Sequence, residues 1–385
     1  MLSPMRSPAE RPRCPHRPPC PGCPRFGDAG IPREARAALA VLCAEAGLPP
    51  PDVMEGWAFG YRHRARLAVR GRSASPKLGV FQEGSHRIVD VPRCLVHHPL
   101  INEVAAAVKQ AVRASGVAPY AERPHRGELR YVQVVVERSS ASAQAVLVGN
   151  SDDPAALQPV AEVLESTLGR RLHSLWWNGN PARTNTILGP RWHRWSGPAA
   201  VCEELGGARV FFPPGAFGQA NLDLFERLVA RVASWVPDGA RVVEFHAGCG
   251  AIGLGLLPRT ASIALNELVP DALEGLALGL AALSPAERAR ATVLPGAAAE
   301  FTEAACAADV VIVDPPRRGL DEKLLEALVR EPPARLIAVS CSLDAFLREA
   351  RALVDAGRLR LDAVVPFALF PHTAHVETLA CFVRI

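Results

Sequence analysis

The stretch Ala240-Arg-Val-Val-Glu244-Phe-His246-Ala-Gly248-Cys-Gly250-Ala-Ile-Gly253 joins an apolar run to closely spaced glycines. Glycines let a backbone turn tightly and approach a ligand at the start of a helix. With the acid Glu267 further on, the spacing also matches a dinucleotide fingerprint, so a nicotinamide-dependent dehydrogenase is a fair alternative. Glu244 favours S-adenosylmethionine instead, because a buried acid suits a cationic sulfonium and is badly placed near a pyrophosphate.

Outward from this stretch, apolar runs alternate with segments of helical periodicity. Short continuous runs of this kind are typical of parallel strands buried on both faces, so we expect an α/β fold here. The runs are ARVVEFH (240–246), ASIALNE (261–267), RATVLP (290–295), ADVVIVD (308–314) and ARLIAVS (334–340). A helix is expected over about 220–235. The final segments, RLRLDAVVPF and VETLACFVRI, have no helix between them and predict a terminal antiparallel pair.

The first half of the chain has a different pattern. Short β-like runs at 64–70, 128–138, 143–149 and 173–179 surround two helical stretches, at about 99–115 and 154–168. We therefore predict three parts: a Cys-rich loop and linker over 1–54, a central α+β domain over 55–205, and the α/β domain over 206–385. Within 1–30, the density of Cys, Pro and Gly is too high for regular structure.

Composition narrows the class of protein. A chain of 385 residues with 49% hydrophobic and 21% charged residues is ordinary for a soluble enzyme. The net charge of +4 permits a nucleic-acid partner without demanding one. No apolar stretch has the length of a membrane span or signal peptide, so we expect a cytoplasmic protein, monomeric and with no membrane partner. Its ten Cys are then reduced, and clusters among them indicate metal binding or catalysis.

Two residues follow strands at the carboxyl edge of the predicted sheet, where α/β proteins bind ligands. Asp314 is held there by Pro315 and Pro316, although a pair of prolines also simply ends a strand. Cys341 follows the fifth strand in Val-Ser-Cys-Ser. A buried structural Cys is the alternative, but a thiol near a helix start should have a lowered pKa and serve as a nucleophile.

Glu377 begins the apolar final strand, where a carboxylate needs a partner or a task. Together, Cys341 and Glu377 provide a thiol and a carboxylate, which are the two groups that methylation of a pyrimidine carbon requires. Carbon 5 of uracil attacks a methyl group only after a thiolate has added at carbon 6, and a base must later remove the proton from carbon 5. Cys341 is the candidate nucleophile and Glu377 the candidate base. The pyrimidine has to leave any stacked structure to reach them.

With these residues in place, the chain resembles the RNA uracil-5-methyltransferase family. The matches lie in family order across about 200–385: Phe217-Gly-Gln219-Ala-Asn221, Asp314-Pro-Pro-Arg317, Ser340-Cys341, and Phe370-Pro-His-Thr-Ala-His375-Val-Glu377. The resemblance implies a Rossmann-like class I methyltransferase domain over 206–385, with Cys341 and Glu377 catalytic. It also implies S-adenosylmethionine as cofactor; the residues expected at this site are Gln219, Glu244, His246, Gly248, Gly250, Glu267 and Asp314. The chain departs from the family pattern at Ser342, Ala368, Ala251 and Ala297, and His246 replaces a common aromatic residue.

Three N-terminal cysteines, Cys14, Cys20 and Cys23, have a spacing that suits convergence on one metal centre, and Cys94 after a short strand is the best fourth ligand. Spacing alone leaves zinc open, with His16, His97 or His98 as a further ligand. The resemblance implies a [4Fe-4S] cluster on the four cysteines. Since the chain also leaves no room before Cys14 for the β-barrel that many relatives carry, it implies the large-subunit (23S) ribosomal-RNA subgroup.

The expected partner is therefore RNA, with rRNA first and tRNA second. Contacts are expected from Arg62, Arg64, Arg66 and the Arg-rich stretch 123–130, although an exposed Arg face is often only solvated. Two alternatives from other classes remain. One is the dehydrogenase; the other is a non-catalytic iron-sulfur RNA-binding paralogue, whose RNA binding would survive loss of Cys341.

Overall fold

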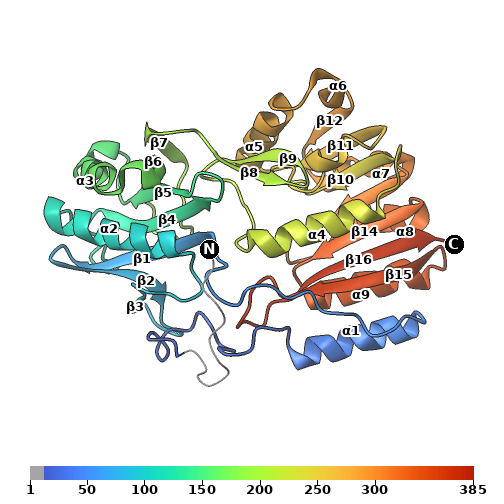
Figure 1. Ribbon diagram of the computed structural model, residues 1–385, viewed down its shortest axis with the longest axis horizontal. Coiled ribbons are helices and arrows are strands. Elements are labelled where there is room, and N and C mark those ends of the chain that lie inside the picture. The colour runs from blue at the N-terminus through green and yellow to red at the C-terminus, as the bar shows by residue number, and fades with distance from the viewer. Residues whose placement is uncertain (1–12) are drawn as a thin grey trace, which may run out of the picture.

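The computed structural model describes residues 13–385, so the first twelve residues of the predicted 1–54 segment lie outside the described residues. Two seven-stranded sheets lie side by side, one built from the first half of the chain and one from the second (Figure 1). We call them the N-terminal sheet and the C-terminal sheet. A two-stranded ribbon, β8 (Val201–Leu205) and β9 (Ala208–Phe212), follows the N-terminal sheet in the chain.

The N-terminal sheet has the order β3-β2-β1-β4-β5-β6-β7, and only the pair β5–β6 is parallel. Helices α2 and α3 cover one face, packing on residues such as Leu67 and Val69. The other face carries the alternating residues of β1, among them Arg66 and Ala68. The elements are β1 (Arg64–Arg72), β2 (Ser75–Phe81), β3 (Ile88–Asp90), α2 (Pro99–Ser115), β4 (Leu129–Glu137), β5 (Ser142–Gly149), η1 (Pro154–Leu157), α3 (Gln158–Leu168), η2 (Gly169–Arg171), β6 (Leu172–Gly179) and β7 (Arg191–Ser196).

The C-terminal sheet has the order β12-β11-β10-β13-β14-β16-β15. All neighbouring pairs are parallel except the two made by β16, which is inserted antiparallel between β14 and β15. The dinucleotide-binding fold has the strand order 3-2-1-4-5-6 and no inserted antiparallel strand. The position of β16 therefore distinguishes this sheet from that of a nicotinamide-dependent dehydrogenase. The prediction of a Rossmann-like class I methyltransferase fold is therefore confirmed. Its strands are β10 (Arg241–Phe245), β11 (Ser262–Glu267), β12 (Ala291–Pro295), β13 (Val310–Val313), β14 (Arg335–Ser340), β15 (Leu359–Phe367) and β16 (Glu377–Arg384).

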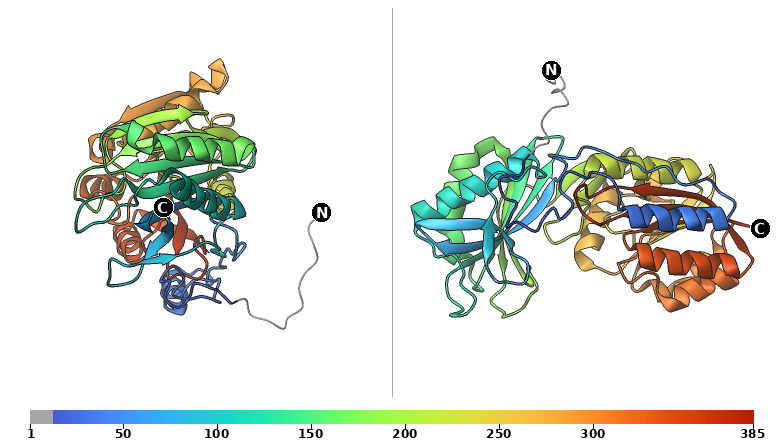
Figure 2. Two further views of the ribbon diagram at one scale, coloured as in Figure 1. Left: turned by 90° about the vertical axis from the view of Figure 1, so that its left-hand side faces the viewer. Right: turned by 90° about the horizontal axis from the view of Figure 1, so that it is seen from below.

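Helices bury both faces of the C-terminal sheet, which explains the continuous apolar runs. On one face α4 and α5 pack together with the β8–β9 ribbon. On the other face α1 packs together with α7, α8 and α9, and Figure 2 shows the blue α1 beside the red α9. The helices are α1 (Arg33–Glu45), α4 (Leu222–Trp235), η3 (Leu254–Leu256), α5 (Pro270–Ala281), α6 (Pro285–Arg288), η4 (Ala298–Glu300), α7 (Thr302–Ala307), α8 (Glu322–Arg330) and α9 (Leu343–Asp355).

The glycine-rich stretch differs from the prediction of a helix after the first strand. Turns and the three-residue 3-10 helix η3 follow β10 instead. Four glycines in eight residues weaken helix propensity, each by about 1 kcal/mol relative to Ala. Close packing requires two of them: a Cβ on Gly253 would lie 2.2 Å from Oε2 of Glu244, and one on Gly255 would lie 2.4 Å from the carbonyl oxygen of Gly206.

Candidate active site

Cys341 and Glu377 lie at the ends of two neighbouring strands. Strands β14 and β16 pair antiparallel with Ser340 opposite Thr378. Cys341 is the next residue after β14, and Glu377 is the residue before Thr378, so the backbone register brings the two to the same edge of the sheet. Paired residues on adjacent strands have Cα atoms about 5 Å apart. The structure therefore brings together the two residues that the sequence predicted as a pair.

A tight turn holds Cys341 between β14 and α9. The hydroxyl of Ser340 donates to the carbonyl of Ser342, 3.1 Å away. Ser342 is the N-cap of α9, where its Oγ accepts a hydrogen bond from the backbone N–H of Ala345. Because Ser and Asn are equally good N-caps, the departure at Ser342 keeps the helix start that positions the thiol.

The prediction of a lowered pKa for Cys341 is wrong. Burial raises the pKa of the thiol, and the carboxylates of Glu377 and Asp314 raise it further. The positive charge of Arg317 opposes these effects but does not reverse them. Sequence reasoning counted the helix start and missed the acids on the neighbouring strands. In the cofactor-free protein, Cys341 is therefore mainly a protonated thiol.

The edge of the sheet concentrates buried carboxyl groups. Glu377 is 4% exposed, and burial and then Asp314 raise its pKa. Burial and then Glu267 raise the pKa of Asp314 to about 7. Glu244 is 1% exposed, its pKa is raised by burial and then by Asp314, and its Oε2 has no hydrogen-bond partner among the described residues. A cation at this edge would stabilise the ionised form of all three groups.

The glycine-rich loop closes over this edge. Glu267 accepts hydrogen bonds from the backbone N–H groups of Gly248, Leu268 and Val269, at 2.7 to 2.8 Å, and so joins the end of β11 to the loop. His246, Gly248 and Gly250 all have positive φ, at 59°, 57° and 82°. The buried Nε2 of His246 has no partner within residues 13–385. Unpaired polar groups of Glu244 and His246 at one tight loop are what a polar ligand would satisfy.

The 217–221 motif is exposed to solvent at its first residue and buried at its last. Phe217 is 72% exposed, and Gln219 is partly buried beside Gly218 and Leu222. Asn221 is the N-cap of α4, and its Nδ2 donates to the carbonyl of Leu369 at 3.0 Å. The motif thus joins α4 to the loop over 368–376, which we call the catalytic loop because it leads into Glu377.

The N-terminal segment is hydrogen-bonded to the catalytic loop. The backbone N–H of Arg25 donates to the carbonyl of His372, and the N–H of His372 donates to the carbonyl of Asp28. The guanidinium of Arg25 also donates to the carbonyl of Thr373 at 3.0 Å. His372 is 1% exposed and has a positive φ of 69°, and its ring packs in a tilted arrangement against Phe26 and Phe59. Sequence reasoning missed this connection, because residues so far apart in sequence carry no common signal.

The same segment brings Cys14, Cys20, Cys23 and Cys94 into one region. Burial first, and then the neighbouring Cys94, Cys20 and Cys14, raise the pKa of Cys23 to about 11. The side chain of Asn102 fixes the backbone of Cys94 through two hydrogen bonds. Within residues 13–385, however, no three His, Cys, Asp or Glu side chains lie close enough to hold a single metal ion.

Two of the three histidines considered as zinc ligands, His16 and His98, form hydrogen bonds with the backbone. Nε2 of His16 accepts from the backbone N–H of Arg93, and Nδ1 of His98 caps α2 by accepting from the N–H of Leu100. Burial, and then the charge of Arg62, lower the pKa of His97 to about 4. Nδ1 of the buried His97 has no hydrogen-bond partner among the described residues, so His97 stays open as a ligand beside the thiols.

The arginines expected to contact RNA divide into two kinds. Arg64 is partly buried and donates to the carbonyl of Ala216, so it fixes the loop before α4. Arg130 is 3% exposed and lies over the ring of Tyr120. Arg66, Arg123 and Arg126 are exposed. Arg64 and Arg130 therefore hold backbone carbonyls in place, a structural role that the sequence did not predict.

None of the helices described in residues 13–385 is long and apolar enough to span a membrane.

Comparison with known proteins assigns the fold and the family. No protein-family model matches the chain. It is 37% identical to an uncharacterized RNA methyltransferase of Protochlamydia amoebophila, across 96% of this chain and 97% of that protein. It is 29% identical to an uncharacterized RNA methyltransferase of Geobacter sulfurreducens, across 100% of this chain and 79% of the relative. A Pyrococcus abyssi tRNA (uracil-54, C5)-methyltransferase, solved with S-adenosyl-L-homocysteine, has a similar fold, with a TM-score of 0.76, 24% identity and coverage of 91% of this chain and 80% of that one.

Proposed function

The chain belongs to a family of RNA methyltransferases, and we propose that it methylates carbon 5 of a uridine in RNA with S-adenosylmethionine. The observation that carries this proposal is the register of β14 and β16, which sets Cys341 beside Glu377. Methylation of a nitrogen or a hydroxyl needs no thiol. Methylation of uracil carbon 5 needs a thiol and a base together.

Cys341 supplies the nucleophile. Its sulfur forms a bond to carbon 6 of the uracil, and carbon 5 gains the electron density with which it takes the methyl group. The raised pKa of Cys341 means that its proton must leave when substrate and cofactor bind. The positive charge of Arg317 already opposes this rise, and the positive charge of a sulfonium, when bound, would lower the pKa of the thiol further.

Glu377 supplies the base. After methyl transfer its carboxylate takes the proton from carbon 5, the electrons of that C–H bond form the 5,6 double bond, and the bond between carbon 6 and Cys341 sulfur breaks. This returns the thiolate and leaves 5-methyluridine. A buried carboxyl with a raised pKa is a stronger base than an exposed one, which suits the removal of a weakly acidic proton.

The residues at the sheet edge fit S-adenosylmethionine, which supplies an electrophilic methyl group on a sulfonium when bound. Glu244 and Asp314 are buried acids whose ionised forms a cation stabilises. His246, Gly248 and Gly250 form the loop that would approach the ligand, and Glu267 holds that loop in place. Gln219 lies in the neighbouring motif and completes the proposed set.

We further propose that Cys14, Cys20, Cys23 and Cys94 hold a [4Fe-4S] cluster. In such a cluster each thiolate binds a different iron, so it requires four converging thiols and not three ligands around one ion. The mutual effect of the four thiols on the pKa of Cys23 supports their convergence. When bound, the cluster would neutralise thiolate charge and order the segment that contacts the catalytic loop.

Large-subunit ribosomal RNA is the proposed substrate, because the four-thiol set resembles that of the ribosomal-RNA subgroup. Transfer RNA is the second candidate, since the Pyrococcus abyssi protein of similar fold is a tRNA methyltransferase. Mapping 5-methyluridine in both RNAs from cells with and without the gene distinguishes them.

The direct test of the chemistry is a trapped protein–RNA adduct. Glu377→Gln should bind RNA and cofactor, transfer the methyl group and then fail to remove the proton, so that a covalent complex accumulates and survives denaturing electrophoresis. The control Glu377→Gln with Cys341→Ser should form none. If Glu377→Gln binds S-adenosylmethionine and uridine-containing rRNA and tRNA but gives no adduct, the proposed function is wrong.

A further inference from the structure

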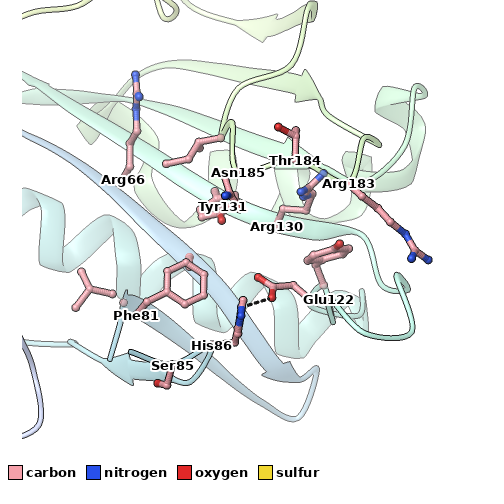
Figure 3. Close-up of a pocket in the computed structure, with 15 residues that line it drawn as sticks. Arg66, Phe81, Ser85, His86, Glu122, Arg130, Tyr131, Arg183, Thr184 and Asn185 are labelled. Atoms are coloured by element: carbon pink, nitrogen blue, oxygen red, sulfur yellow. Dashed lines mark ion pairs between the residues drawn. The ribbon is translucent and has the colours of Figure 1, made fainter. Parts of the chain in front are cut away.

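A cavity of about 840 Å³ opens on the face of the N-terminal sheet that α2 and α3 leave uncovered. Ala68, Gly79 and Tyr131 form its floor, since they are register partners across β2, β1 and β4. Figure 3 shows its walls: His86 and Glu122 on one side, and the loop residues Arg183, Thr184 and Asn185 on another. A volume of this size accommodates a nucleotide.

Positive charge dominates the lining of the cavity. Arg66, Arg130 and Arg183 line it, and within residues 13–385 none of them forms an ion pair. Arg130 is 3% exposed; its Nη1 donates to the carbonyls of Asn180 and Ala182, and its Nε has no hydrogen-bond partner among the described residues. Arg183 is exposed on the loop between β6 and β7. Guanidinium groups in this state are suited to bind an anionic ligand such as a phosphate.

The carboxylate among the lining residues is already neutralised. Glu122 accepts a hydrogen bond from Arg70 at 2.9 Å, and Nδ1 of His86 lies 2.7 Å from its other carboxylate oxygen. Without a free carboxylate from Glu122, a phosphate meets little repulsion. The pair also fixes the wall of the cavity on the side of Tyr120.

Aromatic rings give the cavity a surface for a base. Phe81, Tyr120 and Tyr131 line it, and the guanidinium of Arg70 lies 5.1 to 5.5 Å from the centre of each ring. One cation in contact with three rings holds them in a fixed arrangement. Tyr131 and Phe81 are partly exposed and remain available for stacking. Aromatic rings beside arginines that form no ion pair are the combination that binds single-stranded nucleic acid.

The cavity is joined to the catalytic sheet by a short chain of contacts. Nε of Arg66, in the cavity, donates to Oε1 of Gln133 at 2.7 Å. The amide of the fully buried Gln133 in turn donates to the carbonyl of Pro214 at 2.7 Å, next to the loop that carries Gln219. These two hydrogen bonds fix the floor of the cavity to the segment that precedes Gln219 and α4.

We propose that this cavity, the second nucleotide pocket, takes an unstacked nucleotide of the substrate RNA at a position away from the methylated uridine. This inference rests on the proposed function for the identity of the RNA as substrate. Stacked bases in a helix expose only their edges, whereas a cavity with rings and arginines recognises the face of a free base and its phosphate. The pocket would then select RNAs that present two unstacked nucleotides at the correct separation.

Photochemical crosslinking locates the RNA on the wild-type protein. The probe is a fluorescein-labelled single-stranded RNA of mixed sequence, about 12 nucleotides long, within the range bound by single-strand binding modules. Short-wavelength ultraviolet light joins bases to aromatic side chains that they touch. Mass spectrometry should find nucleotides on Phe81 or Tyr131. Crosslinks on the catalytic loop with none on these two residues would overturn the pocket.

Affinity measurements with variants test the two kinds of contact separately. Arg183→Ala should weaken binding of the same RNA about fivefold and reduce the slope of log K against log salt by about 0.7, the value for one phosphate on a single strand. Phe81→Leu should weaken binding about tenfold and leave the slope unchanged, because stacking does not release counterions. The matched control is Arg113→Ala, an exposed arginine on α2 at the opposite face of the sheet, which should change affinity less than twofold.

The outcomes separate this inference from the proposed function. If Arg183→Ala and Phe81→Leu both bind like Arg113→Ala, the pocket is wrong even where the Glu377→Gln adduct forms. If the adduct fails to form but both pocket variants lose affinity, the pocket stands and the chemistry does not. Uridine monophosphate that competes as strongly as the oligonucleotide would identify a free-nucleotide site and overturn the assignment to RNA.

Discussion

The thiol of Cys341 and the thiols of the N-terminal segment lie in opposite kinds of structure. Cys341 follows a strand whose register with β16 is fixed by six paired residues, and its neighbours are carboxyl groups. Cys14, Cys20 and Cys23 lie in irregular structure beside turns, and Cys23 has other thiols for neighbours. The first site is held by the backbone of a sheet; the second has no sheet or helix of its own to hold it.

This difference shows what each region needs from its ligand. A cation near Cys341 changes the protonation of residues that are already in position. A metal centre at the N-terminal thiols would supply the order itself, because four like-charged thiolates repel one another without it. The two regions are also connected, since Arg25 and Asp28 bind the backbone of the catalytic loop.

The largest effect is expected at Cys341. Cys341→Ser should lower kcat for methyl transfer by more than about 10⁴-fold, because a serine hydroxyl does not ionise at neutral pH and the loss of a nucleophile removes most of the rate enhancement. Cys306→Ser, in α7 and away from the site, is the matched control and should keep wild-type activity. Transfer of labelled methyl groups to RNA measures both. If the activity of Cys341→Ser lies within tenfold of wild type, Cys341 is not the nucleophile and does not differ in this respect from the N-terminal thiols.

The sequence predicts the C-terminal sheet well because its strands are buried on both faces and its helices are amphipathic. It fails where the signal is weak: α1 carries no capping side chain, and the strands β2 and β7 interleave exposed polar residues with few apolar ones. Tertiary packing on the C-terminal sheet, visible at Leu39 and Leu42, decides that α1 forms.

For the site, the sequence predicted which residues lie at the ends of strands, but it did not predict which charged groups surround them. The rule that ligands bind at the carboxyl edge of a sheet predicted Cys341 and Glu377 as site residues, and the structure brings the two together. The direction of the pKa shift at Cys341 depends on Asp314 and Glu377, which come from other strands, so a rule based on the local helix start gave the wrong sign. The contacts of Arg25 with His372 and Thr373 span more than 340 residues and leave no local pattern.

The next effect tests the N-terminal thiols. Cys23→Ser should reduce the iron bound per anaerobically purified chain to near zero, while Cys306→Ser leaves it unchanged. Because a bound cluster would order the turns over 13–32, trypsin should also cut Cys23→Ser there faster than wild type. Methyl transfer should fall by about tenfold, far less than for Cys341→Ser. A colourless wild-type protein containing zinc would contradict the cluster.

A smaller effect tests the connection between the two regions. Arg25→Ala removes hydrogen bonds from a charged donor to the carbonyls of Thr373 and Gly30, each worth about 1.5 to 3 kcal/mol when formed. With a less ordered catalytic loop, kcat should fall roughly tenfold while the Kd for S-adenosylmethionine stays unchanged. Arg36→Ala, an exposed arginine on α1, makes the same change of charge and should alter neither. Equal kcat values for the two variants would show that the regions act independently.

The last effect is a dependence of stability on pH, which the buried acids around Cys341 should produce. The pKa of Asp314 is raised from 3.8 to about 7 in the folded protein, so its contribution to stability is complete below about pH 4 and is lost as the pH rises through 7. Relative to Asp314→Asn, the unfolding free energy of the cofactor-free protein should therefore fall between these limits, by at most about 1.4 kcal/mol per pH unit. Urea denaturation of both proteins at several pH values measures the difference. S-adenosylmethionine should reduce this difference more than S-adenosylhomocysteine does, because the latter lacks the sulfonium charge. If unfolding free energy depends on pH in the same way for the two proteins, Asp314 is ionised even without a cation. The contrast between a pre-organised acidic site and a metal-ordered thiol site would then have no electrostatic basis.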